Sequence, residues 1–312
     1  MSDDLYVLAD FVGDALDLSP AQVTDLSISA PFLTALPMVT SSNGTNHKYM
    51  KETQAPVVGF RAVNAGRDFD HSIDAVVSID LKILDFSWAV DYALAKAWRK
   101  GGAPALIARE GLRHLRSALF QFEKQIFYGT GVADAGGFAG LLDNAQFDAL
   151  ADGMVVNAGG STASTGSSVW LVTAGQDACC SVMREGNPIE LGETVVIDML
   201  DGSSNHYPAY YTPASTWCGL QIGGAFDICR IANLTEDSGK GLTDDLIYTA
   251  LSRFPGGRAP THIVMNRRSL AQLRKSRTAT NPTGNPAPIP REVEGIPILV
   301  TEAITSTEAI ET

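Results

Sequence analysis

Apolar and polar residues alternate strictly over one stretch in the first third of the chain. The apolar positions there are Ile73, Ala75, Val77, Ile79, Leu81 and Ile83. Such alternation is typical of a strand with one buried face. A second apolar run, Val57–Val63, is predicted to be the partner strand, and Asn64–Asp68 has the composition of a turn. The segment from Tyr49 to Leu84 is therefore predicted to be a long β-hairpin, which needs a surface to lie on because an isolated hairpin is marginally stable.

The strongest helical pattern runs from Pro104 to Tyr128. Its apolar residues follow one another at steps of three, four, three and four, at Leu112, Leu115, Leu119, Phe122 and Ile126. A narrow seam of this kind usually packs on a sheet. Pro104 suits the first turn and Gly129 suits the end of the helix. At 1.5 Å per residue the helix would be roughly 37 Å long. A shorter helix is predicted before it, over Trp88–Arg99.

The second half of the chain is mainly strand-like. Strands are predicted over 168–173, 193–198, 207–211, 218–222, 225–231, 261–265 and 296–301, and helices over 242–253 and 269–276. Asp201-Gly202 is predicted to be a hairpin turn. Before the hairpin, residues 1–45 are predicted to form an arm with short helices, interrupted at Pro31 and Pro37. This order of elements predicts an α+β fold.

Composition and net charge exclude several classes of protein. The chain has 312 residues, 45% of them hydrophobic, and a formal net charge of −12. That charge argues against a protein that grips nucleic-acid phosphates over its whole surface. No signal-peptide pattern and no membrane-crossing run is found, so no membrane partner is predicted. The four cysteines favour free thiols in a reducing cytoplasm, although a Cys218–Cys229 bridge stays open. The other two are Cys179 and Cys180.

Charge is distributed unevenly along the chain. The first 47 residues contain no Lys or Arg, and their acids are Asp3, Asp4, Asp10, Asp14, Asp17 and Asp25. The helix predicted near the other end carries Arg267, Arg268, Arg274, Lys275 and Arg277. Exposed charges are usually only solvated. The functional hypothesis is that this basic helix contacts acidic arms of neighbouring copies or an anionic cargo.

Motifs for catalysis, metal binding and cofactor binding are missing. There is no nucleophile elbow, no zinc-protease helix, no phosphate-binding loop and no dinucleotide fingerprint. The histidines are scattered at His47, His71, His114, His206 and His262. No catalytic residue, metal or cofactor is therefore predicted. An enzyme with an unmarked site stays open as an alternative, because such sites are defined by geometry.

Short motifs follow one another over nearly the whole chain. They are 41–45 (SSNGT), 56–66 (PVVGFRAVNAG), 125–131 (QIFYGTG), 137–141 (GFAGL), 168–172 (SVWLV), 217–220 (WCGL), 230–234 (RIANL), 266–267 (NR), 295–298 (GIPI) and 301–304 (TEAI). Each is weak alone, but in this order they resemble the major capsid proteins of tailed bacteriophages. The resemblance implies the HK97-like capsid fold.

That fold implies a division of the chain into four parts. Residues 1–48 would be the N-arm and 49–83 the extended loop, a β-hairpin that lies over a neighbouring subunit. Residues 84–165 with 291–312 would be the peripheral domain, which contains the long spine helix. Residues 166–290 would be the axial domain. The candidate contacts between subunits are Lys51, Phe60, Arg61, Asn64, Arg67 and Phe69, together with the five basic residues of the helix near the C-terminus.

The resemblance also implies a function and partners. Copies would assemble into hexamers and pentamers of an icosahedral shell, which encloses the double-stranded DNA genome without sequence-specific binding. Assembly would take place in the bacterial host cytoplasm, with a separate scaffolding protein, a portal and an optional decoration protein. The alternatives are an encapsulin-type shell around a cargo enzyme, a tail or decoration protein, and the enzyme with an unmarked site.

Overall fold

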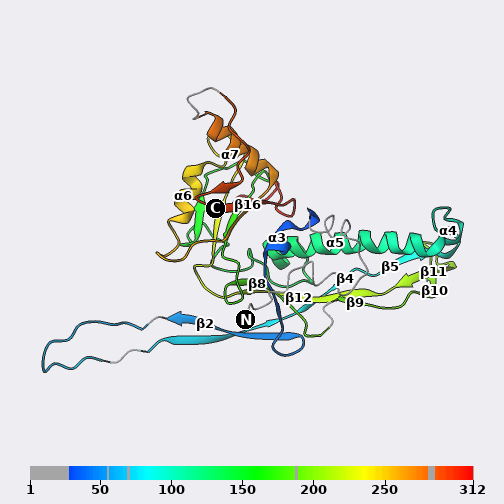
Figure 1. Cartoon of the computed structure of the whole chain (residues 1–312), viewed down its shortest axis with the longest axis horizontal. Coiled ribbons are helices and arrows are strands. Elements are labelled where there is room, and N and C mark those ends of the chain that lie inside the picture. Colours follow the sequence, from blue (N-terminus) through cyan, green and yellow to red (C-terminus); the bar gives the residue numbers. More distant parts are fainter. Residues whose placement is uncertain (1–27, 55, 69–70, 187–188, 280–284, 312) are drawn as a thin grey trace.

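A long helix, two extended sheets, a separate six-stranded sheet and a projecting hairpin make up the computed structural model of the chain (Figure 1). The structure describes residues 28–54, 56–68, 71–186, 189–279 and 285–311. The part of the predicted arm before residue 28 lies outside the described residues.

The helices are α3 (Pro31–Ala35), α4 (Tyr92–Ala97), α5 (Gly102–Val132), α6 (Asp244–Leu251) and α7 (Arg267–Ala279). The strands of the first half are β1 (Met38–Thr40), β2 (Asn46–Gln54), β3 (Ile73–Asp80), β4 (Lys82–Asp85), β5 (Trp88–Asp91), β6 (Val155–Asn157), β7 (Val169–Val172) and β8 (Cys179–Met183). The remaining strands are β9 (Ile189–Leu191), β10 (Val195–Leu200), β11 (His206–Thr212), β12 (Ala214–Ile222), β13 (Ile228–Ala232), β14 (His262–Met265), β15 (Glu292–Val293) and β16 (Ile296–Val300).

The long helix forms as its sequence pattern predicts. Leu115, Leu119, Phe122 and Ile126 are all buried on one side of α5. Regular helix ends at Gly129, whose φ of 59° and ψ of −152° are non-helical. A Cβ atom at this glycine would lie 2.5 Å from the backbone nitrogen of Gly140, so no larger residue fits there.

Two sheets run alongside α5 (Figure 1). One has the strand order β1-β8-β12-β4, with β9 also paired to β12, and the other has the order β10-β11-β5. A turn at Asp201-Gly202 joins β10 and β11, which pair antiparallel as predicted. The third sheet, of order β15-β16-β14-β7-β13-β6, forms a separate unit with α6 and α7. Its strands β7, β13 and β14 are almost entirely buried. Their side chains share one hydrophobic core with α5, where the Phe127 ring lies 6.3 Å from the Trp170 ring of β7.

The structure differs from the sequence-based prediction at two elements. The run Val57–Val63 forms no strand, because the Arg67 guanidinium, not a facing strand, binds the carbonyl oxygens of Val57 and Gly59. The segment Trp88–Arg99 begins as strand β5 before α4, since Trp88 and Val90 alternate inward and pair with β11. The other predicted strands and helices form within a few residues of their expected ends.

Strand pairing joins segments that are far apart in the sequence. Residues 179–222 belong to the two sheets beside α5. Strand β16 pairs with β14 in the six-stranded sheet. Pairing between distant segments decides which strands share a sheet, and no local pattern reveals it.

A buried carboxylate links the N-terminal segment to the long helix. Glu123 of α5 is fully buried and accepts hydrogen bonds from the backbone amides of Phe32 (3.1 Å) and Leu33 (3.3 Å). The hydroxyl of Thr301, just after β16, donates to its other oxygen. Burial raises the pKa of Glu123 from 4.5 to about 7, and the three hydrogen bonds oppose that rise.

A buried arginine holds the C-terminal segment. Arg230 on β13 is 1% exposed, and its guanidinium lies 3.1 Å from a carboxylate oxygen of Glu311 and 3.6 Å from one of Glu308. It also donates to the Ser168 hydroxyl at 3.0 Å, and it stacks over the Trp170 ring at 5.5 Å. The pair with Glu308 is shielded from water on both sides, so neither charge can be removed alone without a large cost.

Replacement of Arg230 by Met is expected to destabilise the unassembled protein by about 3–5 kcal/mol, because Glu308 would keep a buried charge without its partner. The matched control is Arg184→Met, which breaks the half-exposed ion pair with Glu190 and is expected to cost under about 1 kcal/mol. Urea unfolding monitored by fluorescence measures both. Equal losses for the two variants would contradict the buried pair.

The raised pKa of Glu123 predicts a pH dependence of stability. Between pH 4.5 and 7 the folded protein binds a proton at Glu123 that the unfolded chain releases, so stability falls as pH rises through this window. The Glu123→Gln variant keeps the shape and loses the titration. The difference in unfolding free energy between wild type and variant is expected to change by up to about 3 kcal/mol between pH 5 and 8. A difference that stays constant would mean that Glu123 does not titrate there.

Candidate assembly surface

The paired strands β2 and β3 project well beyond the rest of the molecule (Figure 1). Every second residue of β3 from Ala75 to Ile79 is half-buried, namely Ala75, Val77 and Ile79. The residues between them are exposed, as the sequence pattern predicted. Pairing runs from Asn46 opposite Asp80 out to the far ends of both strands. One side of β3 is therefore half-buried, and the other, with Val76 at 66% exposed, is open to solvent.

The base of the hairpin is fixed to the body by hydrogen bonds to the end of β12. The His47 Nε2 atom lies 2.8 Å from Gln221 Oε1, and the Tyr49 hydroxyl donates to the Ile222 carbonyl at 3.0 Å. The amide of Ser42 donates to Nδ1 of His47, so Nε2 carries the hydrogen and donates to Gln221. These contacts set the direction in which the hairpin projects.

The tip of the hairpin, residues 56–68, is apolar and open to solvent. Val58 is 83% exposed, Val63 is 90% exposed and Phe60 is fully exposed. Contiguous apolar side chains of this size mark a contact surface for another molecule. Phe60 is therefore the strongest of the predicted contact residues, because aromatic side chains carry much of the binding energy of interfaces.

The polar residues among the predicted contacts at the tip interact with the backbone of the tip itself. Arg61 donates to the carbonyl of Ala65 at 3.2 Å, and Arg67 donates to the carbonyl of Gly59 at 3.1 Å. Asn64 has a φ of 61°, a conformation that asparagine tolerates better than most residues. These three residues hold the tip in its shape and present its apolar side chains. Phe69 lies outside the described residues.

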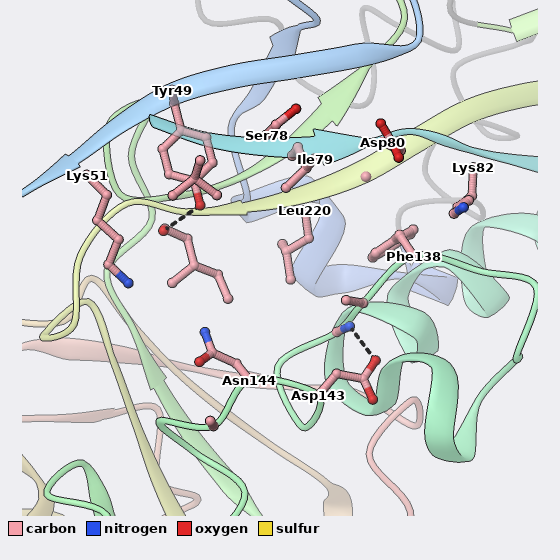
Figure 2. A pocket seen from close by; sticks show the side chains of 16 residues that line it. Tyr49, Lys51, Ser78, Ile79, Asp80, Lys82, Phe138, Asp143, Asn144 and Leu220 are labelled. Atoms are coloured by element: carbon pink, nitrogen blue, oxygen red, sulfur yellow. Dashed lines mark hydrogen bonds between the residues drawn. The ribbon is translucent and has the colours of Figure 1, made fainter. Parts of the chain in front are cut away.

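A cleft of about 540 Å³ lies between the base of the hairpin, the end of β12 and the loop after α5 (Figure 2). Tyr49 and Lys51 line it from β2, and Phe138 and Asn144 line it from the loop. Its floor includes Leu220. Lys51, a predicted contact residue, is half-buried here and is not displayed at the tip.

The carboxylate in this cleft organises the loop. Asp143 accepts hydrogen bonds from the amides of Thr130 (2.6 Å) and Gly140 (3.1 Å) and from the Thr130 hydroxyl (3.0 Å).

A second hollow, of about 800 Å³, is lined by loops 173–178, 223–227 and 257–259. Among the described residues that line the two hollows there is no His or Cys.

The basic residues of α7 do not form one free patch. Arg268 donates to the carbonyls of Thr165 (2.8 Å), Leu234 (3.0 Å) and Ser306 (3.3 Å), and Arg277 forms two hydrogen bonds with Asp244. Arg274 donates to the Ala287 carbonyl at 2.8 Å. Arg267 and Lys275 are exposed, and Arg267 lies 3.8 Å from Glu302. The structure thus brings the five residues onto one helix but leaves two of them directed mainly at solvent.

All four cysteines are free and buried, so the open alternative of a Cys218–Cys229 bridge is not realised. Burial raises the pKa of the Cys218 and Cys229 thiols to about 12. In the part of the chain that the structure describes, no three His, Cys, Asp or Glu residues gather closely enough to hold a metal ion. None of the described helices is both long and apolar enough to cross a membrane.

Some residues that position the hairpin were missed in the sequence. Gln221 and Ile222 anchor it, yet they lie more than 170 residues from their partners His47 and Tyr49. Neither belongs to a charged or aromatic cluster, so the sequence offers no signal for them. The exposed apolar tip, in contrast, could have been found from the run Val57–Val63, in which Arg61 is the one polar residue.

Comparison with known proteins places this geometry in a family. The family model of "Major capsid protein GP7" matches residues 19–311. A chain from bacteriophage Epsilon15 aligns with a TM-score of 0.66 and 22% identity, over 89% of this chain and 88% of that one. The bacteriophage JBD30 capsid aligns with a TM-score of 0.48 and 12% identity, over 94% and 97% of the two chains.

The holo-SrpI encapsulin complex from Synechococcus elongatus PCC 7942 aligns with a TM-score of 0.45 and 11% identity, over 66% of this chain and 88% of that one. The search of curated proteins found no match. The likeness to the Epsilon15 chain shows that the fold is HK97-like, as the sequence motifs implied. The family model covers nearly the whole chain, and the chain therefore belongs to the GP7 family of phage major capsid proteins.

Proposed function

We propose that copies of the chain assemble into hexamers and pentamers of an icosahedral shell that encloses a double-stranded DNA genome. The observation that carries this proposal is the projecting hairpin with its apolar tip, which lies outside the core of its own chain. A surface of this kind is covered when each hairpin lies on a neighbouring copy, and a closed ring of such contacts leaves no tip exposed.

The two structural units suggest how each copy is divided in the shell. We assign the peripheral domain to α5 with the sheets that contain β12 and β11, and the axial domain to the six-stranded sheet with α6 and α7. Residues 1–48 are assigned to the N-arm. The hairpin of β2 and β3 with its tip is assigned to the extended loop over a neighbour. The exposed residues Arg267 and Lys275 are proposed to contact a neighbouring copy.

A capsid protein assembles with copies of itself and is a component of the virion. Its family and fold are structural and not enzymatic. We further propose that assembly takes place in the bacterial host cytoplasm. A separate scaffolding protein, a portal and an optional decoration protein are the proposed partners. The net charge of −12 supports a shell whose wall does not hold DNA tightly, since like charges repel.

The apolar tip predicts a separation of folding from assembly. The double variant Val58→Ser/Phe60→Ser is expected to change the unfolding free energy by less than about 0.5 kcal/mol, because both side chains are exposed in the single chain. The yield of closed shells is expected to fall by at least about tenfold. Negative-stain electron microscopy of particles assembled with the scaffolding protein measures the yield.

Val132→Ser is the matched control for the tip variant. Val132 is 64% exposed at the end of α5 and does not belong to the hairpin tip. Normal shells are expected from it. Wild-type shell yields from the tip variant would overturn the assigned role of the hairpin.

The exposed residues Arg267 and Lys275 of α7 predict a second requirement for assembly. The variant Arg267→Glu/Lys275→Glu is expected to fold normally and to yield fewer closed shells, because a charge reversal at an interface repels what the native charge attracted. Arg253→Glu, an exposed site at the end of α6, is the control. Sedimentation velocity separates shells from free subunits. If the α7 variant forms as many shells as the control, these residues make no important contact.

A further inference from the structure

A tight turn lies between β1 and β2, at the base of the hairpin. The amide of Asn43 donates to the Asn46 carbonyl at 3.0 Å, and the amide of Asn46 donates back to the Asn43 carbonyl at 3.0 Å. Gly44 and Thr45 are the two central residues of this turn. Gly44 has a φ of 58°, which suits glycine in a two-residue hairpin turn. The turn therefore contains the sequence Asn-Gly, which occurs at no other position in the chain.

The reactive groups of this Asn-Gly pair are open to solvent. Asn43 and Gly44 are both exposed, and a Cβ atom placed on Gly44 would meet no atom within 4 Å. Among the described residues, no hydrogen bond involves the side-chain amide of Asn43 or the main-chain nitrogen of Gly44. An unengaged carboxamide thus lies next to an unengaged main-chain nitrogen.

An Asn-Gly pair can modify itself with water as the sole co-reactant. The Gly44 nitrogen attacks the side-chain carbon Cγ of Asn43, so a bond forms between these atoms and the bond from Cγ to Nδ2 breaks. The proton of the Gly44 nitrogen leaves with Nδ2 as ammonia, and a five-membered succinimide ring remains. Water then opens the ring at either carbonyl and gives aspartate or isoaspartate. Glycine favours the attack because it has no Cβ beside its nitrogen.

Asn64, in the tip of the same hairpin, lacks two of these features. It is exposed like Asn43, but Ala65 follows it, and the Ala65 amide donates to the Ala62 carbonyl at 3.3 Å. The nitrogen that would attack is therefore engaged and has a methyl group beside it. Asn64 is the internal comparison for Asn43, because both residues lie in exposed turns.

Isoaspartate at position 43 would disturb the base of the hairpin. The main chain then runs through the former side chain, which adds one methylene group between residues 43 and 44. The paired hydrogen bonds of a two-residue turn depend on the length of that backbone. His47 follows closely, and its Nδ1 accepts from the Ser42 amide while its Nε2 donates to Gln221. A longer turn displaces Ser42 relative to His47 and so loosens this anchor.

We propose that Asn43 is a site of spontaneous deamidation, and that its isoaspartate form loosens the anchor of the hairpin in the unassembled protein. The folded turn slows the reaction, because its two hydrogen bonds hold Asn43 in a bridge with Asn46. The rate therefore follows how often the base of the hairpin opens. Any effect on shells rests on the proposed function, whereas the modification itself does not.

Mass spectrometry of the unassembled full-length protein tests the site. The protein is incubated in mildly alkaline buffer made with H₂¹⁸O, so that each ring that opens acquires one heavy oxygen. Labelling at Asn43 is expected to exceed labelling at Asn64 by at least about tenfold, because only Asn43 precedes glycine. An isoaspartate-specific methyltransferase with a labelled methyl donor identifies the isoaspartate form independently. Equal labelling at the two asparagines would overturn the proposal.

A variant of the anchor tests the dependence on opening of the turn. Gln221→Ala removes the partner of His47 and leaves the Asn-Gly pair intact. Labelling at Asn43 is expected to rise about fivefold, the effect of one lost hydrogen bond on the opening equilibrium. Gln176→Ala, at an exposed glutamine, is the matched control and is expected to leave labelling unchanged. Equal labelling in the two variants would overturn the link between the turn and the anchor.

Aged samples separate this inference from the proposed function. Incubated wild type is expected to lose shell yield in proportion to its isoaspartate content, whereas Asn43→Ser, which cannot form the ring, is expected to keep its yield. Full yield from protein that is mostly isoaspartate would overturn the effect on the anchor.

If fresh wild type and fresh Asn43→Ser both give no shells, the proposed function fails, and hydrogen exchange at the Asn46 amide then measures the turn directly. Faster exchange in aged wild type than in aged Asn43→Ser supports the inference, because that amide donates to the Asn43 carbonyl. Equal exchange overturns it.

Discussion

A hairpin that extends beyond the core of its own chain is the constraint on which the rest of this structure depends. Its tip places Phe60 and Val58 in water, at a cost that folding of the single chain does not recover. The chain must therefore hold the hairpin in place without covering it. Hydrogen bonds from His47 and Tyr49 to the end of β12 do this at the base, and Arg67 holds the tip in shape. The single chain thus holds in place an apolar surface that its own core does not cover.

The need to keep the projecting hairpin in a fixed position also accounts for the buried charged residues. A chain with projecting segments at several places needs strong internal ties between parts that are far apart in sequence. Glu123 ties α3 to α5 and to the segment after β16, and Arg230 ties β13 to Glu308 and Glu311 near the C-terminus. Buried ion pairs add little net stability compared with apolar packing, but they penalise every alternative arrangement. In a protein that must fold before it assembles, such specificity keeps the exposed surfaces in defined positions.

Charge is distributed unevenly over the molecule. The chain is acidic as a whole, yet Arg109, Arg113 and Arg116 lie on one exposed side of α5. The local sign of the surface charge therefore differs from the net charge of the chain.

The sequence by itself determined the elements whose signal is local. The period of α5, its end at Gly129, the alternation of β3 and the turn at Asp201-Gly202 all depend on residues a few positions apart. The order of the short motifs along the chain was enough to identify the family. The tertiary structure alone decided which strands share a sheet, which arginines of α7 are used internally, and how Gln221 anchors the hairpin. These depend on partners far along the chain, and a local pattern carries no information about which distant carbonyl or carboxylate a side chain will meet.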